Sequence, residues 1–225
     1  DLVSADYNED GVVDLKSEYV FAHAYYASSF DKGGKTSYME DITRAFLDGR
    51  KLITSANGEK LTDAQRSELM GHVAIISENW QKVIAESVFK YAGSTYKSLV
   101  ALEDVSNDDL AKEFGKYMKY WGELKGFSMA LQVGKDNIGE SATKLNRMIG
   151  FGPILMDETQ IIGIDSKGNY IMDKIYSMND AKLHMLKIQK LMIDDFGVEA
   201  KSNDMLADMA DLASKIGTSE SAEND

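Results

Sequence analysis

The chain has 225 residues and a formal net charge of −12, with 25 Lys and Arg against 37 Asp and Glu, and it contains no cysteine. The lack of cysteine excludes disulfide scaffolds, thiolate metal clusters and cysteine nucleophiles, and the acidic balance argues against sequence-independent nucleic-acid binding. With 44% hydrophobic and 28% charged residues, the composition is that of an ordinary globular protein rather than a disordered one.

A single proline, Pro153, interrupts the chain, and long stretches lack any helix breaker. This pattern favours helices over a sandwich of short strands, so we expect an all-α fold. No stretch reaches the roughly 18 consecutive apolar residues that a membrane span requires. The chain begins at Asp1 without an initiator methionine or the regions of a signal peptide, which indicates a processed mature form or a fragment.

The N-terminal half is expected to form three helices. Ser17 can cap the first, over about residues 18–30, because a serine oxygen accepts a hydrogen bond from a free backbone N–H. Two later pairs have the spacing of the capping box, which marks a helix start. They predict helices that end near residues 57 and 92, and the pairs are Ser37 with Glu40 and Thr62 with Gln65. One apolar face of the first of these two helices is traced by Met39, Ile42, Phe46 and Ile53.

The middle of the chain is expected to continue as helices. A short helical segment over about residues 96–102 is followed by an acidic turn, and Ser106 can cap the next helix, which ends near residue 132. A further short helix is predicted over residues 140–149.

A small excursion and two more helices complete the prediction. A β-hairpin is expected near residues 159–173, and Ser177 and Asn203 can cap the last two helices. Residues 218–225 carry three acids and no base, so we expect a disordered acidic tail. Residues 1–217 then form a single helical domain, complete or the C-terminal part of a larger one, as an antiparallel bundle of about six to eight helices.

The most specific local pattern lies near the N-terminus, where oxygen-bearing side chains alternate along a loop. Asp6, Asn8, Asp10 and Asp14 occupy the first, third, fifth and ninth positions of a calcium-binding loop. Glycine stands at the sixth position, and the backbone carbonyl of Val12 is available at the seventh. Hard cations such as Ca²⁺ prefer a dense set of oxygen ligands, so the pattern predicts a calcium site that stabilises the fold.

The loop departs from the pattern at its last position. Ser17 stands where a bidentate carboxylate is expected, and Glu18 follows one residue later. Either Glu18 reaches in from the first turn of the following helix, or the site is completed elsewhere. The alternative to a calcium site is an acidic turn whose Asp and Asn side chains bond their own backbone.

The three histidines form no local metal-binding pair. His23, His72 and His184 lack the His-x-x-x-His and His-Glu-x-x-His spacings of zinc peptidases. The chain also lacks the serine nucleophile elbow, the phosphate-binding loop and the dinucleotide fingerprint. His23 fits a buried, hydrogen-bonded histidine better than a ligand or a proton shuttle. We therefore assign no catalytic residue and no organic cofactor.

Several segments share an order and spacing with a known family. Residues 119–127 carry a tryptophan, a glutamate and a Lys-Gly-Phe run, and two shorter elements read Phe-x-x-Gly-Arg at 46–50 and Trp-x-x-Val-x-Ala at 80–85. A Met-Ile-Gly turn at 148–150 and an Asp-Asp-Phe-Gly ending at 194–197 follow. Together these elements resemble the bacterial family called domain of unknown function 4856.

The resemblance implies a helical protein that is exported or lipid-anchored in Gram-negative bacteria. It also implies a likeness to imelysin-like proteins, which are associated with metal or haem acquisition. It implies no activity, because the function of the family is unassigned. Members carry an upstream half with a His- and Glu-bearing segment that nothing here matches, so the chain is the C-terminal part of a longer precursor or another chain holds that half.

The residues and the resemblance together predict a non-enzymatic, exported binding or interaction protein with a structural calcium loop. We expect it in the periplasm or at the outer-membrane or cell surface, anchored through lipid only by a segment not present here. Its expected partner is an envelope protein or the missing N-terminal half of the same precursor, and not a nucleic acid. Two alternatives remain open: an imelysin-type metal-dependent peptidase that uses His23 or His72, and a structural subunit of a larger cell-envelope assembly.

Overall fold

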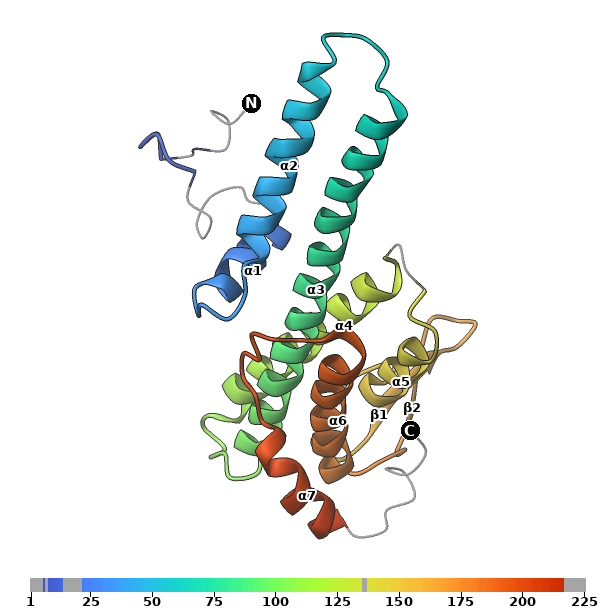
Figure 1. Ribbon diagram of the computed structural model, residues 1–225. Coiled ribbons are helices and arrows are strands. Elements are labelled where there is room, and N and C mark those ends of the chain that lie inside the picture. The colour runs from blue at the N-terminus through green and yellow to red at the C-terminus, as the bar shows by residue number, and fades with distance from the viewer. Residues whose placement is uncertain (1–5, 7, 14–21, 135–136, 217–225) are drawn as a thin grey trace. The chain divides into compact units, whose positions relative to one another are not determined.

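The computed structural model describes residues 6, 8–13, 22–134 and 137–216, which Figure 1 shows as a coloured ribbon. The helices are α1 (Ala22–Asp31), α2 (Tyr38–Ser55), α3 (Asp63–Ala101), α4 (Leu110–Gln132), α5 (Glu140–Ile149), α6 (Met178–Phe196), the 3₁₀ helix η2 (Leu206–Asp208) and α7 (Met209–Ile216). The strands are β1 (Gln160–Ile164) and β2 (Tyr170–Asp173). The expected all-α fold with one small hairpin is therefore confirmed.

Some expected features fall outside the described residues. These are the predicted cap Ser17, the start of the first helix at residues 18–21, the acidic tail at 218–225, and the candidate calcium ligands Asp14 and Glu18. The part of the first predicted helix that is described forms α1.

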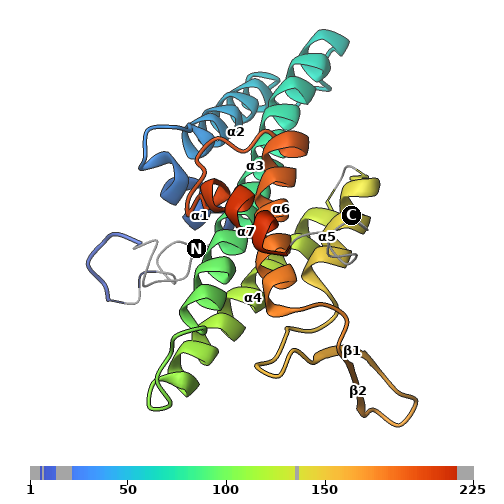
Figure 2. The ribbon, with the colours of Figure 1, turned by 90° about the horizontal axis from the view of Figure 1, so that it is seen from below.

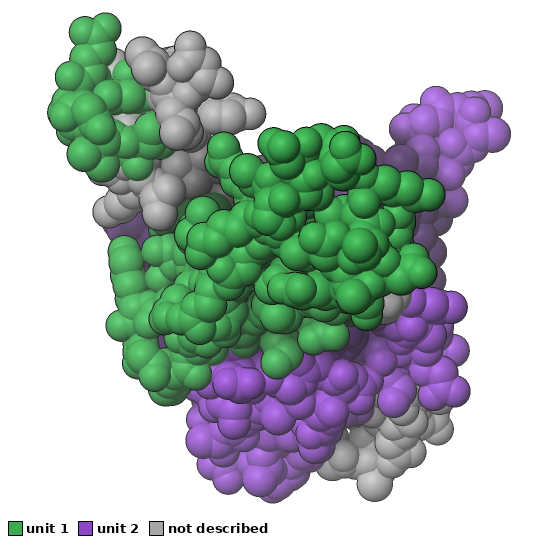
Figure 3. All heavy atoms as spheres, turned by 45° about the horizontal axis from the view of Figure 1, so that its top comes forward, with its two compact units in different colours: residues 1–84 green, residues 85–225 purple. Residues whose placement is uncertain are grey.

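The chain divides into two compact units, residues 1–84 and 85–225, which Figure 3 colours separately. The boundary lies inside α3, so this helix contributes its first part to one unit and its second part to the other. A helix that crosses the boundary leaves no Pro- or Gly-rich linker, which is the usual mark of a domain boundary in a sequence.

The first unit contains α1, α2 and the first part of α3. In Figure 1, α2 and this part of α3 run antiparallel as a helical hairpin, and α1 packs against α2. Gly49 lets the two long helices approach, because a Cβ there would lie 3.3 Å from Leu69 Cδ1 and 3.7 Å from His72 Cβ. The buried side of α2 is formed by Tyr38, Ile42, Ala45 and Gly49.

The start of α3 carries the capping box that the sequence predicts. The Gln65 N–H donates to Thr62 Oγ1 at 3.3 Å, and the Thr62 N–H donates to Gln65 Oε1 at 2.9 Å. These two bonds satisfy backbone donors that have no partner inside the helix.

The start of α2 is capped differently from the prediction. Ser37 makes no side-chain bond to the backbone of the first turn. Instead, the Asp31 carboxylate accepts the backbone N–H of Tyr38 at 2.9 Å and that of Met39 at 2.7 Å. The predicted capping box of Ser37 and Glu40 is therefore wrong. An acid from the preceding helix instead satisfies two other N–H groups of the first turn, those of Tyr38 and Met39.

α3 continues to Ala101, whereas the sequence predicted an end near residue 92 and a separate segment over 96–102. The hydroxyls of Ser94 and Thr95 donate to backbone carbonyls four residues earlier, at 3.0 and 2.7 Å, so they do not interrupt the helix. Gly93 is required by a close approach, since a Cβ there would lie 2.0 Å from the backbone oxygen of Asn203. The small residues serve packing and do not mark a break.

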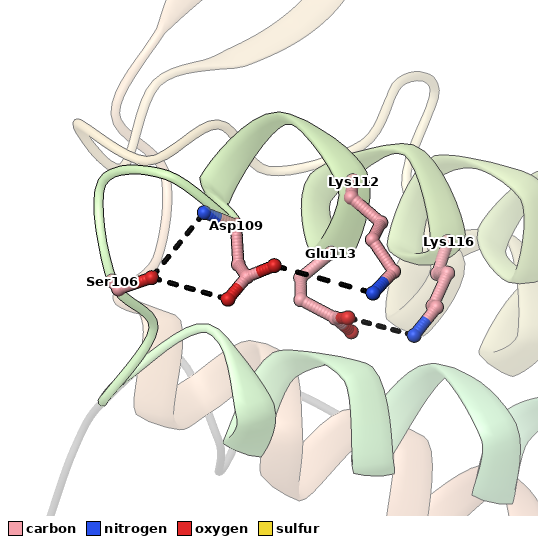
Figure 4. A network of polar contacts seen from close by, with 5 residues as sticks. All are labelled: Ser106, Asp109, Lys112, Glu113 and Lys116. Carbon is pink, nitrogen blue, oxygen red and sulfur yellow. Dashed lines mark hydrogen bonds and ion pairs between the residues drawn. The ribbon is translucent and has the colours of Figure 1, made fainter.

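The start of α4 shows a small polar network, drawn in Figure 4. The Asp109 N–H donates to Ser106 Oγ at 3.3 Å, and the Ser106 hydroxyl donates to Asp109 Oδ2 at 3.2 Å. Lys112 Nζ lies 4.0 Å from Asp109 Oδ1, and Lys116 Nζ lies 2.7 Å from Glu113 Oε1. The hydrogen bond to Glu113 raises the pKa of Lys116. Asp109 is the N-cap residue of α4, and Ser106 closes the turn before it.

α6 is a largely buried helix of the second unit, and it packs against α5 and α7. Its start is a capping box in which Ser177 accepts the backbone N–H of Asp180, as the sequence predicts for Ser177. Its end is Gly197 in the left-handed conformation, which glycine adopts without steric cost.

A buried polar network holds the segment after α6 against the second part of α3. The Glu86 carboxylate accepts the backbone N–H groups of Glu199 at 2.6 Å, Ala200 at 2.7 Å and Lys201 at 3.3 Å. Gln189 on α6 is fully buried and donates to backbone carbonyls of α3 and of this segment. These side chains replace the backbone partners that an irregular segment lacks.

Asn203 does not cap the last helix as predicted. It adopts a φ of 60°, and its amide donates to Ser94 Oγ at 2.8 Å. The last helix instead begins with the 3₁₀ turn η2, which continues into α7. The Asn203 side chain, which local spacing predicted as a helix cap, is instead bound to Ser94 on α3.

The hairpin pairs β1 and β2 in antiparallel register, with Ile164 opposite Tyr170, and Figure 2 shows it extending away from the helices of the second unit. Its turn is organised by Asp165. The Asn169 amide donates to its carboxylate at 3.0 Å, and the N–H groups of Asn169 and Lys167 each donate at 2.8 Å. These hydrogen bonds, that of the Asn169 side chain first, lower the pKa of Asp165.

Candidate functional site

The N-terminal loop folds its polar side chains onto its own backbone. The Gly11 N–H donates to Asp6 Oδ2 at 2.8 Å, the Asp10 N–H donates to Asn8 Oδ1 at 3.0 Å, and the Val12 N–H donates to Asp10 Oδ1 at 2.9 Å. The predicted ligands at the first, third and fifth positions are therefore all fixed to one backbone turn.

The backbone of this loop alternates between left-handed residues and predicted ligands. Glu9 has a φ of 58° and Gly11 a φ of 86°, on either side of Asp10. The Asp6 Oδ1 atom is buried and accepts no hydrogen bond from a described residue. A buried carboxylate oxygen is costly unless a donor or a cation pairs with it. The backbone bonds fit both the calcium loop and the acidic turn, whereas the buried Asp6 oxygen fits the calcium loop better.

The structure places only part of the predicted site. Asp6, Asn8, Asp10 and the Val12 carbonyl belong to the described loop, while Asp14 and Glu18 do not. Within the described residues, no group of three His, Asp or Glu side chains is arranged to hold a metal ion. The described loop supplies two carboxylates, one amide and one carbonyl, so an ion bound there needs further ligands.

The histidines lie in three different environments. His23 on α1 packs edge-on against Trp80, with ring centroids 5.3 Å apart, and burial lowers its pKa. His72 lies on α3 beside Gly49, and His184 on α6 packs against Tyr176, with centroids 5.0 Å apart. The peptidase alternative needs carboxylates beside His23 or His72, and the described residues contain no such metal-binding group.

A groove of about 380 Å³ lies between α2 and α3 in the first unit. It is lined mainly by apolar side chains, together with Arg50, Thr54 and His72. The sequence placed Phe46 and Ile53 on the apolar face of α2, but they are 56% and 54% exposed in this groove. Sequence periodicity finds the apolar face of one helix and cannot show what covers it.

A second cavity, of about 550 Å³, lies in the second unit among Glu103, Asp157 and Glu158, with Met156 and Met178 nearby. Its acids are already engaged. Glu103 pairs with buried Lys182, Asp157 accepts the Thr159 hydroxyl, and Glu158 Oε1 accepts the N–H that opens α6 at 3.1 Å. These bonds serve turns and helix ends.

Two of the segments quoted for the family resemblance meet in the second unit. The Trp121 indole N–H donates to the Ile149 carbonyl at 3.2 Å, and Lys125 Nζ donates to the Gly150 carbonyl at 2.5 Å. They cap the end of α5, whose last carbonyls lack helical partners, and burial lowers the pKa of Lys125. These motif residues therefore join α4 to α5.

No protein-family model, curated protein or solved structure matches this chain. The likeness to domain of unknown function 4856 stays a prediction that depends on the quoted residues. Among the described helices, none combines the length and the apolar character that a membrane span demands.

Proposed function

We propose that the chain is a non-enzymatic binding protein that works outside the cytoplasm and carries one structural calcium site in its N-terminal loop. The observation that carries the proposal is the loop from Asp6 to Val12, in which three predicted ligands are fixed by backbone hydrogen bonds and the Asp6 Oδ1 atom is buried without a described donor. Calcium would supply the missing positive partner.

The donor set favours a hard cation. Every side-chain ligand is an oxygen from Asp or Asn, and neither histidine nor cysteine lies among the described residues of the loop. Oxygen-only sites suit Ca²⁺, whereas zinc prefers nitrogen and sulfur. Asp14 and Glu18 are the proposed remaining ligands.

The proposed location follows from the expected affinity. A single loop with few carboxylates is typical of sites that fill only at the calcium levels found outside cells, where dissociation constants are on the order of 10⁻⁴–10⁻³ M. Periplasmic or cell-surface placement, and a link to metal or haem acquisition, rest on the sequence resemblance.

The test compares two variants that each remove one negative charge from the loop. Asp6→Asn changes a proposed ligand, and Glu9→Gln changes the left-handed residue between two ligands. We expect Ca²⁺ to raise the melting temperature of the wild-type chain and of Glu9→Gln, and to have little effect on Asp6→Asn.

Isothermal titration calorimetry, in which Ca²⁺ is added to protein that a chelator has freed of metal, gives the number of calcium ions bound per chain. One site per chain supports the proposal. The absence of heat and of a melting shift, or an equal shift in both variants, would show that the loop is an ordinary acidic turn.

A further inference from the structure

The groove between α2 and α3 has two helical walls, and the lining residues of each follow one another at steps of three, one and three positions. One wall is formed by Phe46, Gly49, Arg50 and Ile53, and the other by Leu69, His72, Val73 and Ile76. Steps of three and four residues place each set along one side of its helix, so each wall presents a continuous ridge.

The walls expose large apolar side chains. Phe46 is 56% exposed and Ile53 54% exposed on α2, and Val73 is 41% exposed on α3. Contiguous apolar surface of this kind marks interaction sites. The face between two antiparallel helices is where a further helix packs in a bundle, and helix-in-groove recognition uses the same 3–4 spacing of anchors.

The charges of α2 indicate what the occupant carries. Arg44 pairs with Glu40, and Lys51 pairs with Asp48 at 3.0 Å. Arg50 forms no ion pair with a described residue and lines the groove, and the lining contains no carboxylate. Among the described residues, the groove thus presents a positive charge without an ion-pair partner, in a chain whose net charge is −12.

We propose that this groove binds one amphipathic α-helix of a partner protein, with apolar side chains at 3–4 spacing and a carboxylate that pairs with Arg50. A second copy of the chain fits less well. A two-fold contact through the groove would set the same apolar and basic lining on both sides, without a carboxylate for either Arg50. The inference rests on the interaction part of the proposed function and does not depend on the calcium loop.

The test uses two synthetic amphipathic helices of about five turns that share one leucine stripe and differ only in Glu or Lys on the flanks. Binding is measured by fluorescence anisotropy at physiological salt with EDTA present. We expect the Glu peptide to bind about tenfold or more tightly than the Lys peptide, although the net charge of the protein favours the opposite order. Arg50→Glu should reverse this preference.

Two matched substitutions locate the binding site. Phe46→Glu places a negative charge in the groove. Met129→Glu places the same charge outside the groove, at a 55% exposed position of α4. We expect Phe46→Glu to weaken binding about tenfold or more and Met129→Glu to leave it unchanged, with circular dichroism showing that both variants are folded.

Several results would overturn the inference. These are no binding of either peptide by the folded protein, equal binding of both peptides, or binding that Phe46→Glu leaves intact. A dimer that sedimentation detects and that Phe46→Glu dissociates would assign the groove to a second copy. Because the calcium titration is a separate measurement, failure here leaves the calcium site standing.

Discussion

Two tyrosines of the second unit keep their phenol groups away from water. Burial raises the pKa of Tyr176 to about 12, and it also raises the pKa of Tyr117. The Tyr117 oxygen accepts the backbone N–H of Ile154 at 3.0 Å, so this phenol also fixes the segment that leads into β1. Burial disfavours the charged phenolate in both cases.

The shift at Tyr176 predicts a loss of stability at alkaline pH. In the unfolded chain the phenol loses its proton near about pH 10, whereas the folded chain holds it until about 12. The folded state then binds more protons, so the free energy of unfolding falls as pH rises through this window, by at most about 1.4 kcal/mol per pH unit for this group. Urea unfolding at several pH values between those limits should show a shallower fall for Tyr176→Phe. Parallel curves for the two proteins would contradict the assignment.

At the level of single residues, the turn at residues 6–12 could be predicted because its polar side chains lie within a few positions of each other, while calcium binding there stays a proposal. Alternation at Asp6, Asn8 and Asp10 is visible in the sequence, and the structure gives these residues the backbone bonds of one turn. That Arg50 pairs with no acid in the part of the chain that the structure describes could not be predicted. This depends on the ion pairs that neighbouring residues of α2 form with each other, and on the residues of α3 that line the other side of the groove.

The glycines of α3 supply a test at the level of one helix. Gly93 faces the Asn203 carbonyl, and a Cβ there would lie 2.0 Å from that oxygen. Gly71 lies in the same helix, and apart from its chain neighbours and the nearby backbone of that helix, no described atom lies within 4 Å of its Cβ position. Alanine favours a helix over glycine by about 1 kcal/mol, so Gly71→Ala should stabilise the protein by up to that amount. Gly93→Ala should destabilise it by about 1–3 kcal/mol because the contact forces the segment away.

Urea midpoints of the two variants and the wild type provide the measurement. Opposite signs are expected although the substitution is the same. Stabilisation by both would mean that the segment around Asn203 does not pack against α3.

Helix starts show where prediction by element succeeds and where it fails. Thr62 and Ser177 cap helices through residues three positions ahead, and this spacing is legible in the sequence. Asp31 caps a helix that begins seven residues later, and Asn203 bonds to Ser94 on another helix. Local spacing therefore predicts that a helix begins, while the group that caps it is decided by tertiary packing.

At the scale of the whole chain, α3 joins two units of different character. Every residue from 63 to 82 is exposed or half-buried, whereas most residues from 83 to 99 are buried. The first part lines the open groove, and the second part holds the Glu86 network and the Gly93 contact. One uninterrupted helix therefore begins as a surface helix with a single apolar face and continues as a core helix that is covered on most sides.

This difference predicts a step in backbone protection along a single helix. Local opening needs less free energy where few apolar contacts are lost, so amides before about residue 83 should exchange faster than those after it, by about tenfold or more. Hydrogen exchange with mass spectrometry on overlapping peptides of α3 measures the step. The Glu peptide of the groove experiment serves as a control. A bound helix covers only the first part of α3, so it should slow exchange of the amides there and make the step smaller. Uniform protection along α3 without the peptide would show that the helix opens as one unit and that the boundary near Ile84 has no energetic meaning.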